Sequence, residues 1–246
     1  AINSVHKRII TIEEPVEYEL KGVNQIAVRS DIGLTFAMGL RHILRQDPNV
    51  VMVGEIRDQE TADIAIRASL TGHLVFSTLH TNDAPSAFTR LTDMGIEPFL
   101  IASSVEAVQA QRLVRTICPH CKTEQKVDHD YLRRVGFPEN EIETAKFWHG
   151  AGCEHCRQQG YQGRKGIYEL LIVTETLRPL IMNRAPATTI AQLAIQNGMR
   201  TLRTDGWNKV KAGITTIEEV LRVTQMEEHR EALAGGDDKT QFISRS

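Results

Sequence analysis

Four cysteines carry the clearest chemical signal in this 246-residue sequence. They form two C-x₂-C pairs, and 31 residues separate the first pair from the second. Four thiolates suit a tetrahedral structural Zn²⁺, with bonds of about 2.3 Å. The alternative is a thioredoxin-like redox pair, which needs one C-x-x-C after a strand, so two pairs in a region of little periodicity fit it poorly. We expect a closed zinc site made by Cys118, Cys121, Cys153 and Cys156.

Acidic residues and a histidine follow three apolar stretches of the sequence. Glu13 and Glu14 end the first stretch, Glu55 ends the second and His80 ends the third. In a parallel sheet, ligands bind at the carboxyl ends of the strands. Groups of these types can hold Mg²⁺, orient a water or sense a phosphate. A lone glutamate at a strand end is often only solvated, but three such ends favour one shared site.

Strands and helices alternate along residues 1–114. Asp58 is typical of a helix N-cap, and Thr35 stands near the start of another apolar helical pattern. Because the strands are apolar on both faces, the pattern predicts an α/β fold with a mostly parallel sheet covered by helices. The expected strands span residues 8–14, 23–31, 49–55 and 73–81, and the expected helices span residues 34–48, 58–73, 83–95 and 97–114.

The rest of the chain has a different character. Residues 115–170 hold the cysteines, with one weak helix at 129–136, and form the predicted zinc module. Residues 171–225 read as four short helices, and residues 226–246 as a disordered tail. The residues before the first strand read as the end of a helix.

Composition excludes several classes of protein. A formal charge of −2 gives no support for a general nucleic-acid or membrane-surface binder. No apolar run approaches the roughly 20 residues that span a bilayer, and the first residues show no signal-peptide pattern, so a cytoplasmic protein is expected. Arg164 and Lys165 lack interleaved aromatic residues beyond two tyrosines, so we expect no nucleic-acid partner.

Three quoted stretches carry a family resemblance: ITIEEPVEYELKGVNQ, LRQDPNVVMVGEIRD and TGHLVFSTLHTNDA. They resemble the Asp, Walker B and His boxes of secretion ATPases, and AQRLVRTICPHCK follows where that family has its zinc module. Over roughly residues 5–224 the chain resembles the type II secretion and type IV pilus assembly ATPases, the GspE/PilB family. The resemblance implies a RecA-like P-loop NTPase core over residues 1–114, with ATP and Mg²⁺ as cofactors beside Zn²⁺.

The resemblance also implies roles for single residues. Glu55 matches the Walker B glutamate, which positions Mg²⁺ or polarises the attacking water. Glu13 matches the Asp-box glutamate, and Glu14 stands where many members carry aspartate, with a reach one methylene longer. His80 matches the histidine that contacts or senses the γ-phosphate, and His73 is the second choice for that contact.

Three arginines, Arg41, Arg45 and Arg57, are expected near the nucleotide edge. The arginine fork is planar and always charged, so it suits phosphate clamping. An ordinary surface salt bridge explains each of them equally well.

One family motif is absent from these 246 residues. A P-loop ATPase needs G-x-x-x-x-G-K-[ST], whose backbone amides cradle the phosphates, and no such run occurs in the sequence. In the family this loop precedes the Asp-box strand by one helix. The simplest interpretation is a C-terminal fragment cut just after the loop. We expect the chain alone to hydrolyse ATP poorly or not at all.

Two functions remain open at this point. The first is a motor: part of a homohexamer at the cytoplasmic face of the inner membrane, contacting a membrane platform protein and driving assembly of pilin or pseudopilin subunits. The second is a zinc-containing binding module with no nucleotide chemistry. The strand-end acids and the His box favour the motor. Retraction motors lack the tetracysteine pattern, so the cysteines favour the assembly or secretion side.

Overall fold

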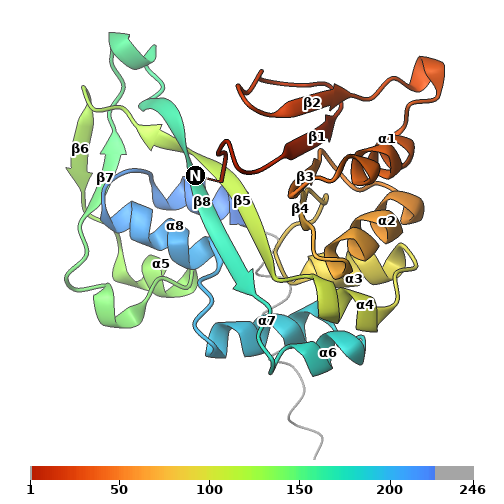
Figure 1. Ribbon diagram of the computed structural model, residues 1–246. Coiled ribbons are helices and arrows are strands. Elements are labelled where there is room, and N and C mark those ends of the chain that lie inside the picture. Colours follow the sequence, from red (N-terminus) through yellow and green to blue (C-terminus); the bar gives the residue numbers. More distant parts are fainter. Residues whose placement is uncertain (1, 225–246) are drawn as a thin grey trace, which may run out of the picture. The chain divides into compact units, whose positions relative to one another are not determined.

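The computed structural model describes residues 2–224 (Figure 1). Two compact units form within this part of the chain, and the chain passes between them more than once. The first comprises Ala1–Val108 and Ile172–Ala194. The second comprises Gln109–Leu171 and the described part of Ile195–Ser246. The tail predicted at residues 226–246 lies outside the described residues.

A four-stranded parallel sheet forms the centre of the first unit, with the strand order β2-β1-β3-β4. Ile12 lies opposite Val53, and Val53 lies opposite Ser77. The carboxyl ends of three neighbouring strands are therefore level at one edge of the sheet. This confirms the predicted α/β fold with a parallel sheet. The strands are β1 (Ile9–Glu13), β2 (Asn24–Ala27), β3 (Val50–Val53) and β4 (Leu74–Ser77).

Helices α1 (Phe36–Ile43) and α2 (Gln59–Leu70) pack along this sheet (Figure 1). Both begin at caps that the sequence indicates: the Thr35 side chain accepts a hydrogen bond from Met38 N, and that of Asp58 accepts one from Thr61 N. No helix of residues 2–224 is long and apolar enough to span a membrane. The unit also contains η1 (Ser30–Ile32), η2 (Leu44–Gln46), α3 (Ser86–Asp93), α4 (Pro98–Ser104), α6 (Arg178–Met182) and most of α7 (Ala187–Gln196).

Strand β4 differs from the prediction that every strand is covered on both faces. It lies at an edge of the sheet, and Leu74 and Phe76 are 45% and 44% exposed. The residues of β1 and β3 are mostly buried. The apolar run predicts the strand correctly, but it does not distinguish a central strand from an edge strand.

Two further expectations about elements are wrong. Residues 2–8 contain no helix. The helix expected over residues 97–114 ends at Ser104, and residues from Ala107 onward form strand β5 (Ala107–Ile117). Ala110 and Val114 are buried in β5 and are four residues apart, a spacing that suits a helix as well as a strand.

In the second unit, β5 pairs with β8 (Tyr161–Ile172), while β6 (Lys122–Gln125) and β7 (Phe147–Gly150) form an antiparallel pair. A core of Leu132, Phe137, Phe147, Trp207 and Val220 joins the segment between the cysteine pairs to the C-terminal helices. The 31 intervening residues therefore form a folded insertion, not a loop. The other elements of this unit are α5 (His129–Arg134), η3 (Glu139–Glu141), η4 (Glu154–Cys156), α8 (Leu202–Lys211) and a helix over residues 217–224.

Candidate functional site

The carboxyl edge of the parallel sheet is closely packed around Gly54. Gly54 N donates to Ile12 O at 2.7 Å, and Thr78 Oγ1 donates to Gly54 O at 2.7 Å. A Cβ at Gly54 would lie 3.3 Å from Ile12 O and 3.4 Å from the Glu13 Cα. A side chain at this position would require these neighbours to shift by a few tenths of an ångström. Glycine therefore fits the close packing here, and Glu55 follows it at the junction of the strand ends.

Glu55 is the centre of a charged cluster at this edge. Arg57 Nη2 lies 2.6 Å from Glu55 Oε1, and His80 Nε2 lies 2.9 Å from Glu55 Oε2. Arg57 Nη1 also donates to Glu14 Oε2 at 2.9 Å. One guanidinium and one imidazole thus join groups that follow β1, β3 and β4. Four of the predicted site residues, Glu14, Glu55, Arg57 and His80, come together here.

The charges of this cluster stabilise its ionised form. The hydrogen bond from Arg57 lowers the pKa of Glu55, burial opposes the shift, and the contact with His80 adds to it. The hydrogen bond with Glu55 in turn raises the pKa of Arg57. Only 15% of the Glu55 side chain is exposed, compared with 82% for His80. Glu55 is therefore a carboxylate held by two partners, whereas most of the His80 ring is exposed to solvent.

Glu13 has separate partners on the same sheet edge. Its Oε1 accepts from Thr11 Oγ1 at 2.6 Å and from Gln25 Nε2 at 2.9 Å. Gln25 is fixed in turn, because its Nε2 donates to Tyr18 O and its Oε1 accepts from Leu20 N. Neither partner belongs to the site residues predicted from the sequence. Thr11 could have been found from the two-residue period of β1, whereas Gln25 required the β1–β2 register, in which it lies opposite Thr11.

The structure does not bring the remaining predicted nucleotide residues to this cluster. Arg41 Nη2 lies 2.6 Å from Glu60 Oε1, in an exposed pair. Arg45 is exposed in η2, and its side chain has no hydrogen bond or ion pair within residues 2–224. His73 precedes β4 and contacts Ala68 O at 3.1 Å, so the length of that strand, about 13 Å, separates it from the carboxyl edge. Their nucleotide roles stay predictions.

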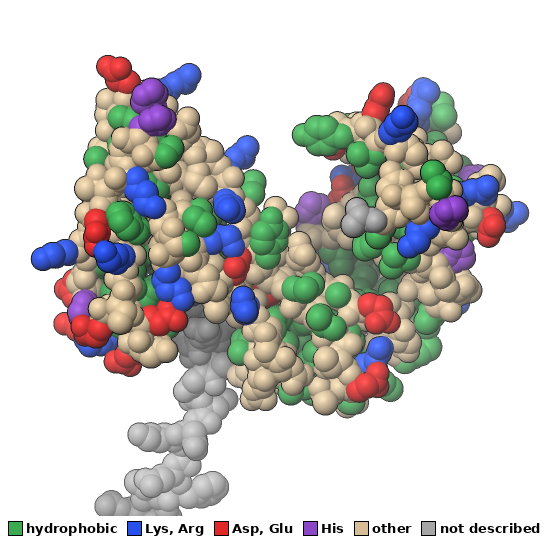
Figure 2. Space-filling model, turned by 60° about the vertical axis from the view of Figure 1, so that its left-hand side comes forward, with side chains coloured by type: hydrophobic (Ala, Val, Ile, Leu, Met, Phe, Trp, Pro, Cys, Tyr) green, Lys and Arg blue, Asp and Glu red, His purple; other side chains and the backbone are tan. Residues whose placement is uncertain are grey.

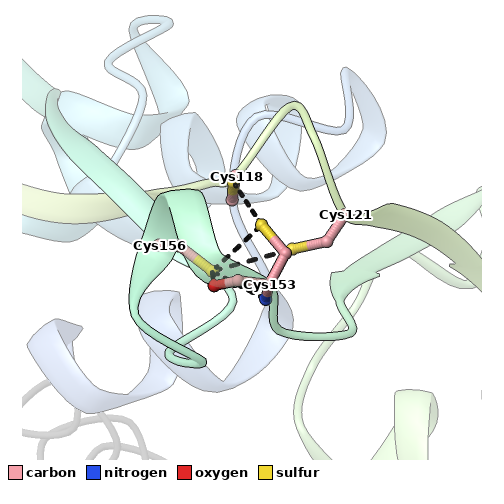
Figure 3. Close-up of side chains that lie close together, drawn as sticks. All are labelled: Cys118, Cys121, Cys153 and Cys156. Atoms are coloured by element: carbon pink, nitrogen blue, oxygen red, sulfur yellow. Dashed lines mark hydrogen bonds between the residues drawn. The ribbon is translucent and has the colours of Figure 1, made fainter.

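The four cysteines of the second unit converge on one point, as Figure 3 shows. Sγ–Sγ distances are 3.8 Å for Cys118–Cys153, 3.8 Å for Cys121–Cys156 and 3.7 Å for Cys153–Cys156. Four sulfurs at the corners of a tetrahedron, each about 2.3 Å from a central ion, would lie about 3.8 Å apart. The distances are far longer than the roughly 2.0 Å of a disulfide. The predicted cluster is confirmed, and its geometry can hold a tetrahedral metal ion.

Two glycines allow the loops that carry these cysteines to pack. Gly160 has φ +73°, and a Cβ there would lie 2.4 Å from Gly150 O. Gly160 N donates to Cys156 Sγ at 3.2 Å, and Cys118 N donates to Gly160 O at 2.9 Å. The backbone of Gly160 therefore links the two C-x₂-C pairs by hydrogen bonds, one of which is donated to the Cys156 sulfur.

The thiols differ in how readily they lose their protons. Burial raises the pKa of Cys156, but N–H groups of Cys153 and Gly160 outweigh it and lower that pKa to about 6. Burial and the neighbouring thiols raise the pKa of Cys121 to about 12. The backbone N–H groups thus favour the thiolate form of Cys156. The full set needs a cation to hold four negative charges this close together.

The chain matches a known family over nearly its whole length. The family described as "Type II/IV secretion system protein" matches residues 1–222. Curated relatives include the type IV pilus assembly ATPase PilB of Thermus thermophilus, 55% identical over 89% of this chain and 24% of the relative. The type II secretion system protein E of Dickeya dadantii is 50% identical over 92% of this chain and 44% of the relative. The chain thus spans less than half the length of these relatives.

Solved structures of other proteins have a fold similar to that of this chain. The pilus retraction motor PilT with bound ADP aligns with a TM-score of 0.65 and 29% identity, over 92% of this chain and 55% of that chain. The Legionella pneumophila ATPase DotB aligns with a TM-score of 0.62 at 21% identity, which supports the fold alone. With the family match, the three strand-end motifs and the cysteine cluster, the chain belongs to the type II/IV secretion system protein family.

Proposed function

We propose that this chain is part of an ATPase that assembles pilin or pseudopilin subunits for pilus extension or protein secretion. It supplies the catalytic residues at the carboxyl edge of the sheet and a metal-binding site. The observation that carries the proposal is the position of Glu55, held by Arg57 and His80 at the carboxyl edge of a parallel sheet. Nucleotides bind at this edge in open α/β sheets. An ATPase of this kind also needs a phosphate-binding loop, and no G-x-x-x-x-G-K-[ST] run occurs in these 246 residues.

Each residue of the cluster has a role in hydrolysis that follows from its contacts. Glu55 orients the attacking water or accepts its proton, since it is ionised and has little freedom to move. Arg57 leaves its carboxylate partners to contact phosphate oxygens, and His80 turns toward the γ-phosphate. Glu55 and Glu14 offer oxygen ligands to Mg²⁺, which supplies charge neutralisation at the phosphates when it is bound. Glu13, held by Thr11 and Gln25, is the second candidate for water activation.

The sheet has an edge where the missing part of such a site could attach. Among residues 2–224, β4 pairs only with β3, and Leu74 and Phe76 are nearly half exposed on it. A further strand beside β4 would cover this edge and bring its own carboxyl end next to His80. The proposal places the strand that carries the phosphate-binding loop at this edge.

The tetracysteine cluster is proposed to hold Zn²⁺ as a structural ion. Cys118, Cys121, Cys153 and Cys156 supply all four ligands, which leaves no open position for a substrate. The ion would join the end of β5 to the turn before β8. Its role is to fix the fold of the second unit rather than to act in hydrolysis.

The proposed assembly is a homohexamer at the cytoplasmic face of the inner membrane, acting on a membrane platform protein. The names of the curated relatives support the assembly and secretion side: the pilus assembly and secretion proteins are 47–55% identical to this chain. The retraction motor PilT is 29% identical. The cysteine pattern points the same way.

The test is ATP hydrolysis by the whole protein that contains this chain. Replacing Glu55 by Gln removes a general base, so kcat should fall at least about 100-fold. Glu97→Gln is the matched control, since that exposed carboxylate lies 3.9 Å from Arg184 and has no proposed role. The 246-residue chain alone should show no turnover. Equal activity of the two variants would refute the proposal and favour a zinc-containing binding module.

A further inference from the structure

A pocket of about 420 Å³ lies in the second unit and includes none of the residues discussed so far for hydrolysis or metal binding. It lies between the β6–β7 strand pair, the segment before β7 and the end of α8. This volume is within the range of roughly 300–1,000 Å³ that is usual for small-molecule sites. The residues that matter here are Lys122, Lys146, Lys211, Trp148 and Glu141.

The lining of this pocket carries an excess of positive charge. Lys211 Nζ pairs with Glu141 at 2.5 Å, and Lys146 Nζ lies 4.0 Å from Glu124. No carboxylate of residues 2–224 lies within ion-pair distance of Lys122 Nζ, which instead lies 4.7 Å from the centre of the Trp148 ring. On the face in Figure 2, Lys and Arg are interspersed with Asp and Glu, and the chain carries a net −2.

Gly213 packs against two residues that line the pocket, Lys122 and Trp148. It has φ +64°, and a Cβ there would lie 2.4 Å from Lys122 Nζ and 2.7 Å from Trp148 Cδ1. Only a residue without a side chain lets the ammonium and the indole lie this close to the backbone. The Trp148 indole N–H has no hydrogen-bond partner within residues 2–224, and it lies near the same point at Gly213 as Lys122 Nζ.

We propose that this pocket binds the phosphate group of an anionic ligand. Lysine is a compact point charge and a common phosphate ligand. Lys122 is the principal contact, because its charge is not neutralised by a carboxylate. Lys146, whose carboxylate partner is distant, and the Trp148 N–H add donors. The phosphate belongs either to a soluble compound or to a lipid headgroup, and the chemistry of the contact is the same for both. The proposal is independent of the ATPase function.

Inorganic phosphate is the first probe, used with the zinc-loaded 246-residue chain. The chain has two tryptophans, so an NMR spectrum contains two indole N–H signals, and Trp148→Phe assigns them. We expect phosphate to shift the Trp148 signal saturably at constant ionic strength. The Trp207 signal should stay unchanged, because that side chain is only 3% exposed in the core.

Lysine variants locate the contact. Lys122→Gln should weaken the phosphate affinity at least about tenfold, the lower end of the effect of losing a hydrogen bond to a charged group. Lys126→Gln is the matched control, an exposed lysine four positions further along that does not line the pocket. Absence of a saturable shift, or equal weakening by the two variants, would overturn the proposal.

Vesicles distinguish the two sources of phosphate. Phosphatidylglycerol in phosphatidylcholine vesicles should displace phosphate from Trp148 if the ligand is a lipid headgroup, whereas phosphatidylcholine alone should not. Phosphate binding that vesicles leave unchanged would identify a soluble ligand. If neither phosphate nor phosphatidylglycerol vesicles shift the Trp148 signal, the pocket is not a phosphate site.

Discussion

Replacing Glu219 by Gln should destabilise the second unit by about 2 kcal/mol at pH 7. The Glu219 side chain is 1% exposed and accepts hydrogen bonds from Arg115 N at 3.0 Å, Arg115 Nη2 at 2.5 Å, and Arg222 Nε and Nη2 at 3.0 Å each. The bonds from Arg115 connect β5 to the helix at residues 217–224, and those from Arg222 lie within that helix. Glutamine keeps the shape but loses the charge, so two guanidiniums are left without their counterion.

The magnitude follows from the shift in acidity. Burial by itself raises the pKa of Glu219, but Arg222 and Arg115 outweigh it and lower that pKa from 4.5 to about 2. Such a shift corresponds to about 3 kcal/mol. The two arginine side chains are 48% and 56% exposed, and solvent screening reduces the figure to about 2 kcal/mol. Since the pKa is lower in the folded state, this stability is complete above pH 4.5 and is lost as the pH falls toward 2.

Urea denaturation of the zinc-loaded chain measures the effect, with the fluorescence of buried Trp207 reporting on this unit. Glu218→Gln is the control, because Glu218 is the exposed neighbour of Glu219 on the same helix. Both variants keep the four cysteines, so loss of metal in acid affects them alike. The reasoning is refuted if the two variants are equally stable at pH 7, or if the difference between them grows as the pH falls.

Two further predictions concern the partners of Glu13 and the metal. Gln25→Ala removes an amide that fixes Glu13, so kcat of the whole protein should fall about tenfold with KM for ATP nearly unchanged; a change in KM alone would contradict this positioning role. Cys153→Ser should reduce the zinc content, measured by elemental analysis of the purified chain, and should lower its melting temperature. Unchanged zinc in that variant would mean that the ligands differ from the four cysteines.

The parts of the fold that the sequence predicts are those set by local patterns. Apolar runs identify β1, β3 and β4, and the side chains of Thr35 and Asp58 cap α1 and α2 as expected. Local patterns are less informative where one spacing suits two structures. Residues 107–114 fit a helix by composition, but in the fold they pair with β8, and that pairing depends on residues more than forty positions away.

The candidate site is predictable in its residue types but not in its connections. The spacing of Glu14, Glu55 and His80 at strand ends indicates that they meet, because parallel strands align their carboxyl ends. The sequence does not show that Arg57 joins Glu55 to Glu14, which lies 43 residues before Arg57. It also does not reveal Gln25, because strand register depends on the whole sheet.

The way the chain alternates between its two units limits how this protein can be divided experimentally. The first unit needs Ile172–Ala194, and the second needs residues both before and after that segment. Within the second unit, Arg115 meets Glu219 across 104 positions. A ribosome must therefore have synthesised almost all of the described chain before either unit has its full set of partners. No single cleavage releases one intact unit. Expression of either unit alone therefore requires that its two separate segments be joined by a new linker.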